Sequence, residues 1–145
     1  MKNWALMLAV SANIAIAETE APAMSMGNGD NNWIVTEGAT REGSNFVFPK
    51  VRIAGAGWLV MHPFKDGKPN GKVVAGYAGV PDGVSENVSI TVDQAPTAGA
   101  PYIVMLHSDA NQNGRFDFVF VSEREVVDAA VFEGSTMIGH VYVTP

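Results

Sequence analysis

The chain has 145 residues, of which 47% are hydrophobic and 17% are charged, and its formal net charge is −6. Nine Lys and Arg residues are scattered along an acidic chain, which argues against nucleic acid as a partner because binding phosphates requires clustered basic side chains. The apolar content is enough for a core and argues against global disorder, and the length predicts one domain.

The first seventeen residues have the pattern of a secretory signal peptide. Lys2 precedes an apolar run, and Ala15-Ile16-Ala17 places small residues where signal peptidase cleaves. The run is shorter than the roughly 20 apolar residues that a membrane-spanning helix needs. We therefore expect residues 1–17 to be removed, the mature form to have no transmembrane segment, and the protein to be exported to the periplasm or the cell exterior.

The chain after the signal divides into a leader and a domain. Residues 18–32 are rich in Pro, Gly, Ser and Asn and have no periodic apolar pattern, which predicts a flexible leader. The folded domain is expected at residues 33–145. Because there is no Cys, disulfides cannot stabilise this exported domain, and its stability must come from its core.

Short apolar runs separated by Gly-rich and Asn-rich turns predict seven or eight strands. In residues 87–92 apolar and polar residues alternate with a period of two, which is typical of a strand with one wet face. Residues 58–61 and 102–106 are apolar throughout, which predicts central strands covered on both faces. Further strands are expected at residues 46–53, 72–77, 116–121, 126–132 and 137–143. The spacing favours an all-β fold, an antiparallel β-sandwich of immunoglobulin-like type.

Two motifs carry a resemblance to a known group of proteins. They are Gly-Trp-Leu-Val-Met-His at residues 57–62 and Met-Leu-His-Ser-Asp-Ala-Asn-Gln-Asn-Gly-Arg-Phe-Asp-Phe at residues 105–118. With them the chain resembles a family of uncharacterised secreted and cell-surface domains of archaea and bacteria, over about residues 45–144. The resemblance implies a β-sandwich and implies no activity.

The second motif also has the spacing of a calcium-binding loop. Oxygen-bearing side chains alternate along it, and Gly114 stands where such loops turn sharply. The pattern is incomplete because Phe120 occupies the position of the bidentate Glu, so binding would be weak. The candidate calcium ligands are Asp109, Asn111, Asn113, the backbone carbonyl of Arg115, and Asp117.

The same loop has an interpretation without any ion. Asn113-Gly114 could form the type I′ turn of a β-hairpin, in which both central residues have positive φ. Asp109 and Asn111 would then accept hydrogen bonds from their own backbone. The sequence favours this plain turn over calcium and leaves both open.

The three histidines each lie close to a methionine. Imidazole and thioether are the ligands that an exported copper protein without Cys would use, so the candidate copper ligands are His62, Met105, His107 and His140. Because strand neighbours point to opposite faces, Met105 and His107 can share a site whereas Met61 and His62 cannot. The alternative is that the methionines fill the core and the histidines form structural hydrogen bonds.

The usual catalytic motifs are missing. There is no Cys nucleophile, Gly-x-Ser-x-Gly elbow, His-Glu-x-x-His or phosphate-binding loop. His107 with Asp109 could act as an acid-base pair, but no nucleophile accompanies it. The sequence therefore predicts no enzyme. It predicts an exported binding or structural module that acts with a periplasmic or cell-surface protein and is steadied by calcium, and copper handling is the alternative.

Overall fold

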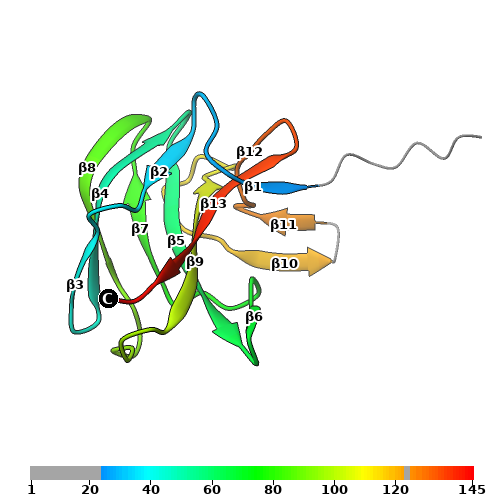
Figure 1. Cartoon of the computed structure of the whole chain (residues 1–145). Coiled ribbons are helices and arrows are strands. Elements are labelled where there is room, and N and C mark those ends of the chain that lie inside the picture. The colour runs from blue at the N-terminus through cyan, green and yellow to red at the C-terminus, as the bar shows by residue number, and fades with distance from the viewer. Residues whose placement is uncertain (1–23, 123–124) are drawn as a thin grey trace, which may run out of the picture.

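The computed structural model describes residues 24–122 and 125–145, and no helix occurs in this part of the chain (Figure 1). The predicted signal peptide at residues 1–17 lies outside the described residues. The strands are β1 (Ser25–Gly27), β2 (Trp33–Val35), β3 (Thr40–Glu42), β4 (Asn45–Ile53), β5 (Gly57–Lys65), β6 (Lys68–Pro69), β7 (Gly76–Val80), β8 (Gly83–Thr91), β9 (Pro101–Ser108), β10 (Val119–Ser122), β11 (Glu125–Val127), β12 (Phe132–Glu133) and β13 (Thr136–Val143).

The strands form two main sheets and a separate two-stranded ribbon. The smaller sheet joins β2, β3 and β8 to the long strand β4. The larger sheet is centred on β7, β5, β9 and β13, which pair in antiparallel fashion, and β6 and β12 extend it. Because β1 joins β13 in parallel, this sheet is mixed, whereas the sequence predicted antiparallel strands throughout. The two strands β10 and β11 pair with each other.

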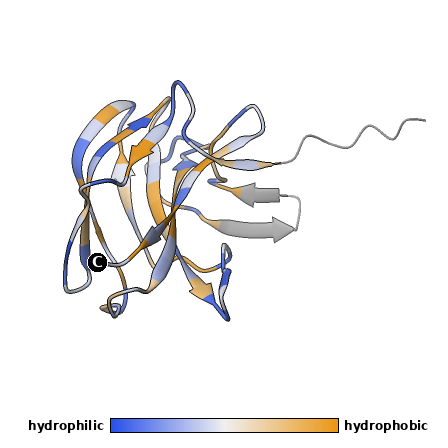
Figure 2. Ribbon diagram, in the orientation of Figure 1, coloured by the Kyte–Doolittle hydropathy of each residue, from blue (hydrophilic) through white to orange (hydrophobic). Residues whose placement is uncertain are grey.

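The core lies between the two sheets. The smaller sheet contributes Phe46 and Phe48, both fully buried, and their rings meet Tyr102 and Tyr142 of the larger sheet edge to face. The predicted alternation in residues 87–92 is confirmed, because Val88, Ile90 and Val92 are buried and the residues between them are exposed. Figure 2 shows the same alternation of hydrophobic and hydrophilic residues along the smaller sheet.

The outer face of the larger sheet is covered as well. The segment from Asp109 to Val131 leaves β9, forms the ribbon of β10 and β11, and returns along the sheet, where Ala130 bridges to His107. Figure 1 places this ribbon on the side of the larger sheet away from the smaller sheet. The central strands β5 and β9 are therefore covered on both faces, which explains why their sequences are apolar throughout.

Four segments differ from the sequence expectations. The strands expected at residues 72–77 and 116–121 begin only at Gly76 and Val119, and the strand expected at 126–132 is divided between β11 and β12. The expected leader contains β1, so the packed part of the chain begins before Trp33. One carboxylate holds the segment that follows β1, because the backbone amides of Asp30 and Asn31 donate to Glu133 at 2.7 and 2.8 Å. Such a contact between distant segments has no local sequence signal.

Residues 24–122 and 125–145 contain no helix with the length and apolar character needed to cross a membrane.

Candidate metal centre

Two histidines meet on the outer face of the larger sheet. His62 on β5 is opposite Ile103 of β9, and His107 on β9 is opposite Trp58 of β5, so the two are not direct cross-strand neighbours. Their imidazole rings lean toward each other across the intervening row, in which Met105 lies. The two Nε2 atoms are 3.1 Å apart, and the ring centroids are 5.3 Å apart.

Backbone carbonyls fix the tautomer of both rings. The Nδ1 atom of His62 lies 2.8 Å from the carbonyl oxygen of Val73, and that of His107 lies 2.6 Å from the carbonyl oxygen of Asp128. A carbonyl oxygen only accepts, so each Nδ1 carries the hydrogen and donates it. In the neutral rings both Nε2 atoms therefore present lone pairs to each other. This arrangement is repulsive unless a cation, either a proton or a metal ion, lies between them.

Burial disfavours a proton in this position. The exposed fraction is 1% for His62 and 2% for His107. Burial lowers the pKa of the His107 ring to about 4, although the hydrogen bond to the Asp128 carbonyl opposes this effect. Burial also lowers the pKa of His62, against the raising effect of its bond to Val73. Both rings are therefore neutral near pH 7, and a neutral imidazole is the form that binds metals.

The histidine pair opens into an apolar hollow of about 540 Å³. Three of the side chains around it are methionines from β9, β13 and the residue before β1. None of the described lining residues is charged. The lining residues are Met24, His62, Pro69, Gly71, Ile103, Met105, His107, Phe118, Ala129, Ala130, Phe132 and Met137.

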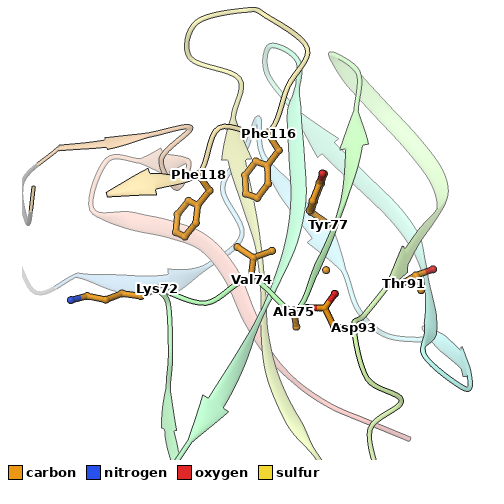
Figure 3. A pocket seen from close by; sticks show the side chains of 9 residues that line it. Lys72, Val74, Ala75, Tyr77, Thr91, Asp93, Phe116 and Phe118 are labelled. Atoms are coloured by element: carbon orange, nitrogen blue, oxygen red, sulfur yellow. The ribbon is translucent and has the colours of Figure 1, made fainter. Parts of the chain in front are cut away.

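Two phenylalanines cover the pair from the segment that precedes β10. The rings of Phe116 and Phe118 stack on each other, with centroids 5.7 Å apart. Phe118 meets His107 edge to face at 5.1 Å and His62 at 5.5 Å. Figure 3 shows both rings side by side, with Tyr77 next to Phe116 in a neighbouring pocket. These aromatic rings reduce the access of water to the imidazoles.

Asp128 connects the histidine pair to the acidic loop. Its carbonyl holds His107, its Oδ1 accepts from the amide of Ala110 at 3.1 Å, and its Oδ2 accepts from the amide of Asp117 at 2.8 Å. Asp128 is fully buried, and its φ of +49° lies in the left-handed region. The carbonyl of Asp128 therefore orients the His107 ring, and its carboxylate holds both ends of the acidic loop.

The predicted calcium ligands do gather in one loop, which closes on its own hydrogen bonds. The amides of Asn113 and Gly114 donate to the carboxylate of Asp109, and the side chains of Asn111 and Asn113 donate to Asp117. The hydrogen bonds from the side chains of Asn113 and, to a lesser extent, Asn111 lower the pKa of Asp117. The backbone amide of Arg115 donates to Asn113.

The turn in this loop differs from the predicted hairpin. Gln112 and Gly114 have positive φ, and Asn113 does not, so Asn113-Gly114 is not a type I′ turn. Strands β9 and β10 on either side belong to different sheets and are not paired. The reason is the length of the connection, because ten residues between Ser108 and Val119 leave room for a loop built on side-chain acceptors.

Two other candidates are not brought into the site. His140 is opposite Val104, a core residue, and so lies on the other face of the sheet, where its Nε2 is 2.7 Å from Oδ1 of Asn28. Nδ1 of His107 donates to the Asp128 carbonyl and its Nε2 faces His62, so neither ring nitrogen contacts Asp109 and the suggested acid-base pair is not formed. Sequence reasoning placed Met105 and His107 on one face, as found.

Several residues of the site were not singled out from the sequence. The carbonyls of Val73 and Asp128 lie in segments without a motif, so no residue type could reveal them. Phe116 and Phe118 alternate in the motif that ends at residue 118, which is a weak signal for two side chains on one face. Met24 and Met137, by contrast, were visible in the sequence as thioethers that could bind copper, but no spacing relates them to His62 and His107.

Comparison with known proteins gives one match. A family model described as a domain of unknown function, DUF7282, matches residues 33–144. No curated protein and no solved structure matches the chain.

Proposed function

The chain belongs to the DUF7282 family, a domain of unknown function, and we propose that it is an exported, non-catalytic protein that binds Cu⁺ through His62 and His107. The observation that carries the proposal is the pair of facing Nε2 atoms, 3.1 Å apart, with both Nδ1 atoms held by backbone carbonyls. Metal-binding histidines commonly donate their other ring hydrogen to such a carbonyl, which fixes the ring for the metal.

The spacing of the two nitrogens suits a shared ion. With metal–nitrogen bonds of about 2.0 Å, two nitrogens 3.1 Å apart subtend an angle of about 100° at the metal. This angle is close to that in trigonal and tetrahedral sites, so one or two positions stay open for further ligands. The thioether of Met105, in the row between the histidines, is the nearest candidate along the strand.

The chemistry of the hollow favours copper in its reduced state. Thioethers are soft ligands that select Cu⁺, and imidazole also binds copper well. The described lining has no carboxylate to compensate a dipositive ion, and the cost of placing an ion in an apolar site rises with the square of its charge. Among residues 24–122 and 125–145 no three His, Asp or Glu side chains gather as a metal site. A monovalent soft cation therefore fits better than Zn²⁺ or Ca²⁺.

Two features support the wider setting of the proposal. The signal pattern at residues 1–17 supports export to the periplasm or cell exterior, where a chain without Cys must use methionine as its sulfur ligand. The pairings of β4 with β8, β5 with β9, and β9 with β13 support an immunoglobulin-like sandwich, since they correspond to its B–E, C–F and F–G pairs. In that scheme the site lies beneath the F–G connection.

The test is a titration of the mature protein with Cu⁺ without oxygen, against a chromophoric Cu⁺ chelator. His62→Asn and His107→Asn are the informative variants, because the Asn amide can replace the Nδ1 donor while the Nε2 ligand is removed. We expect one Cu⁺ per wild-type chain and a loss of affinity of at least about 100-fold in each variant.

His140→Asn is the matched control, since His140 lies on the other face, and its affinity should stay within threefold of wild type. Wild type that binds no Cu⁺, or a His140→Asn variant that loses as much affinity as the other two, would overturn the proposal. Tighter binding of Zn²⁺ than of Cu⁺ under the same conditions would overturn the choice of metal.

A further inference from the structure

Methionines line the route from the surface to the histidine pair. In the parallel pairing of β1 with β13, Met26 is opposite Met137, and Ser25 is opposite Thr136. The hydroxyls of Ser25 and Thr136 are 3.0 Å apart, so these two side chains share one face of the sheet. Since side chains alternate along a strand, Met26 and Met137 share the other face.

These methionines range from exposed to buried. The exposed fraction is 69% for Met24 and 38% for Met26, Met137 is half-buried, and Met105 is 6% exposed. Met24, Met137 and Met105 line the same hollow as His62 and His107. The thioethers therefore lead from solvent, along β1 and β13, to the buried imidazoles.

A glycine keeps the route open between β13 and β9. Gly139 is opposite Met105 and two residues from Met137, so it stands on the same face between them. A Cβ atom at this position would lie 3.0 Å from Cβ of Met105. Because Gly139 has no side chain, this residue places no atoms beyond its backbone between Met137 and Met105.

We propose that Met24, Met26 and Met137 form an outer thioether site that accepts Cu⁺ from a donor and passes it to His62 and His107. This inference rests on the proposed function. Copper stays monovalent throughout, and each step forms one Cu–S or Cu–N bond while a bond to the previous ligand breaks. No proton has to leave, because the Nε2 atoms of both neutral rings already carry lone pairs.

The exposed methionines could instead act only as an apolar cover. In that case leucine, which has nearly the same volume, should replace them without any effect on copper. If they relay the metal, leucine should slow its transfer and leave the final affinity unchanged, since the resting ligands are deeper in the hollow. The rate of Cu⁺ transfer and the equilibrium affinity, measured together, therefore distinguish three roles of these methionines: relay, apolar cover and ligand of the resting site.

The experiment compares wild type, the double variant Met24→Leu/Met26→Leu and Met137→Leu by stopped-flow absorbance. Transfer of Cu⁺ from its coloured chelator complex is followed under anaerobic conditions, and affinity is measured by competition in the same buffer. The matched control is Met61→Leu, a buried methionine next to His62 that points into the core on the opposite face. We expect transfer at least about tenfold slower in the two test variants, affinity within threefold of wild type, and no change in the control.

Unchanged transfer rates in both test variants would overturn the relay, and so would a tenfold loss of equilibrium affinity, which would make these methionines ligands of the resting site. Equal slowing in Met61→Leu would also overturn it. If wild type binds no Cu⁺, the proposed function itself fails. If wild type binds Cu⁺ and the methionine variants take it up at the wild-type rate, the proposed function stands and only the relay fails.

Discussion

His62 and His107 direct their Nε2 atoms at each other across 3.1 Å, while their Nδ1 atoms donate to the carbonyls of Val73 and Asp128. Without a cation between the rings, two properties of this pair conflict. Its hydrogen bonds fix both lone pairs in the gap, and its burial makes protonation of either ring unfavourable. A cation that does not require a hydrated environment resolves this conflict.

The first prediction concerns the acid stability of the metal-free protein. The folded state holds the pKa of His107 at about 4, below its ordinary value of 6.5, so as the pH falls the unfolded chain takes up the proton first. The free energy of unfolding should therefore be highest above pH 6.5 and fall between pH 6.5 and 4, with a contribution from this ring of up to about 3 kcal/mol. Urea unfolding at several pH values measures this loss.

His107→Asn isolates the contribution of the ring from that of the carboxylates, which also lose stability in acid. The variant should show a shallower dependence on pH than wild type over the same interval. An identical slope in the two proteins would contradict the prediction. Saturating Cu⁺ should protect wild type in this interval, since bound metal competes with the proton.

The second prediction concerns Asp128. Both of its carboxylate oxygens accept from backbone amides in a fully buried position, so Asp128→Asn places an NH₂ group against an N–H donor. Asn tolerates positive φ, so the backbone itself is not strained by the change. We expect a loss of about 1 to 3 kcal/mol in the free energy of unfolding, together with weaker Cu⁺ binding because the Asp128 carbonyl orients His107.

Asp82→Asn provides the comparison, because Asp82 is exposed and accepts one amide, that of Gly55, at 2.8 Å. The free energy of unfolding of Asp82→Asn should fall by less than about 1 kcal/mol, and the copper affinity of this variant should not change. Equal effects of the two substitutions, measured by chemical denaturation and competition titration, would show that Asp128 has no special role.

The third prediction concerns the contact between β5 and β9 at Gly57. A Cβ atom at Gly57 would overlap the carbonyl oxygen of His107 and lie 2.6 Å from Cδ1 of Ile53. Because a backbone atom on a paired strand cannot move aside cheaply, Gly57→Ala should reduce stability by about 2 to 3 kcal/mol. Gly27→Ala, where no atom lies within 4 Å of the added carbon, should be nearly neutral. Similar melting temperatures of Gly57→Ala and Gly27→Ala would contradict the prediction that the close contact at Gly57 excludes a side chain.

The sequence predicted the parts of the fold that depend on local pattern. Alternation identified the strand at residues 87–92, and continuous apolar runs identified β5 and β9 as covered on both faces. Strand parity also placed Met105 and His107 on one face. The three-residue strand β1 was not predicted, because its Ser, Met and Gly residues do not favour a strand. It forms because it pairs with β13, which is about 110 residues away in the sequence.

The site could be predicted only in its residue types. Nothing local relates His62 to His107, which are 45 residues apart and meet through strand register and the lean of both rings. His140 also has a methionine nearby, Met137, and its position on the core face is what separates it from the pair. The choice among three histidines therefore required the tertiary structure.

The last prediction concerns the acidic loop, where calcium and a self-sufficient turn lead to different results. The carboxylate of Asp109 accepts from the amides of Asn113 and Gly114, at 3.2 and 2.9 Å, and Asp117 accepts from two asparagine side chains. Because these carboxylates already have protein donors, we expect millimolar Ca²⁺ and a chelator to give the same wild-type melting temperature.

If the loop needs no ion, Asp109→Ala should destabilise the protein by about 1 kcal/mol with or without Ca²⁺. The amide of Gly114 then loses its acceptor, and that of Asn113 keeps only the longer bond to Asn111. Asp117→Ala should cost less, since the asparagine side chains that it releases can turn to water. Calcium would be established by the opposite pattern, a Ca²⁺-dependent rise in wild-type melting temperature that both substitutions abolish. In that case the side-chain amides of Asn111 and Asn113 would have to rotate so that their oxygens, in place of their nitrogens, face the ion.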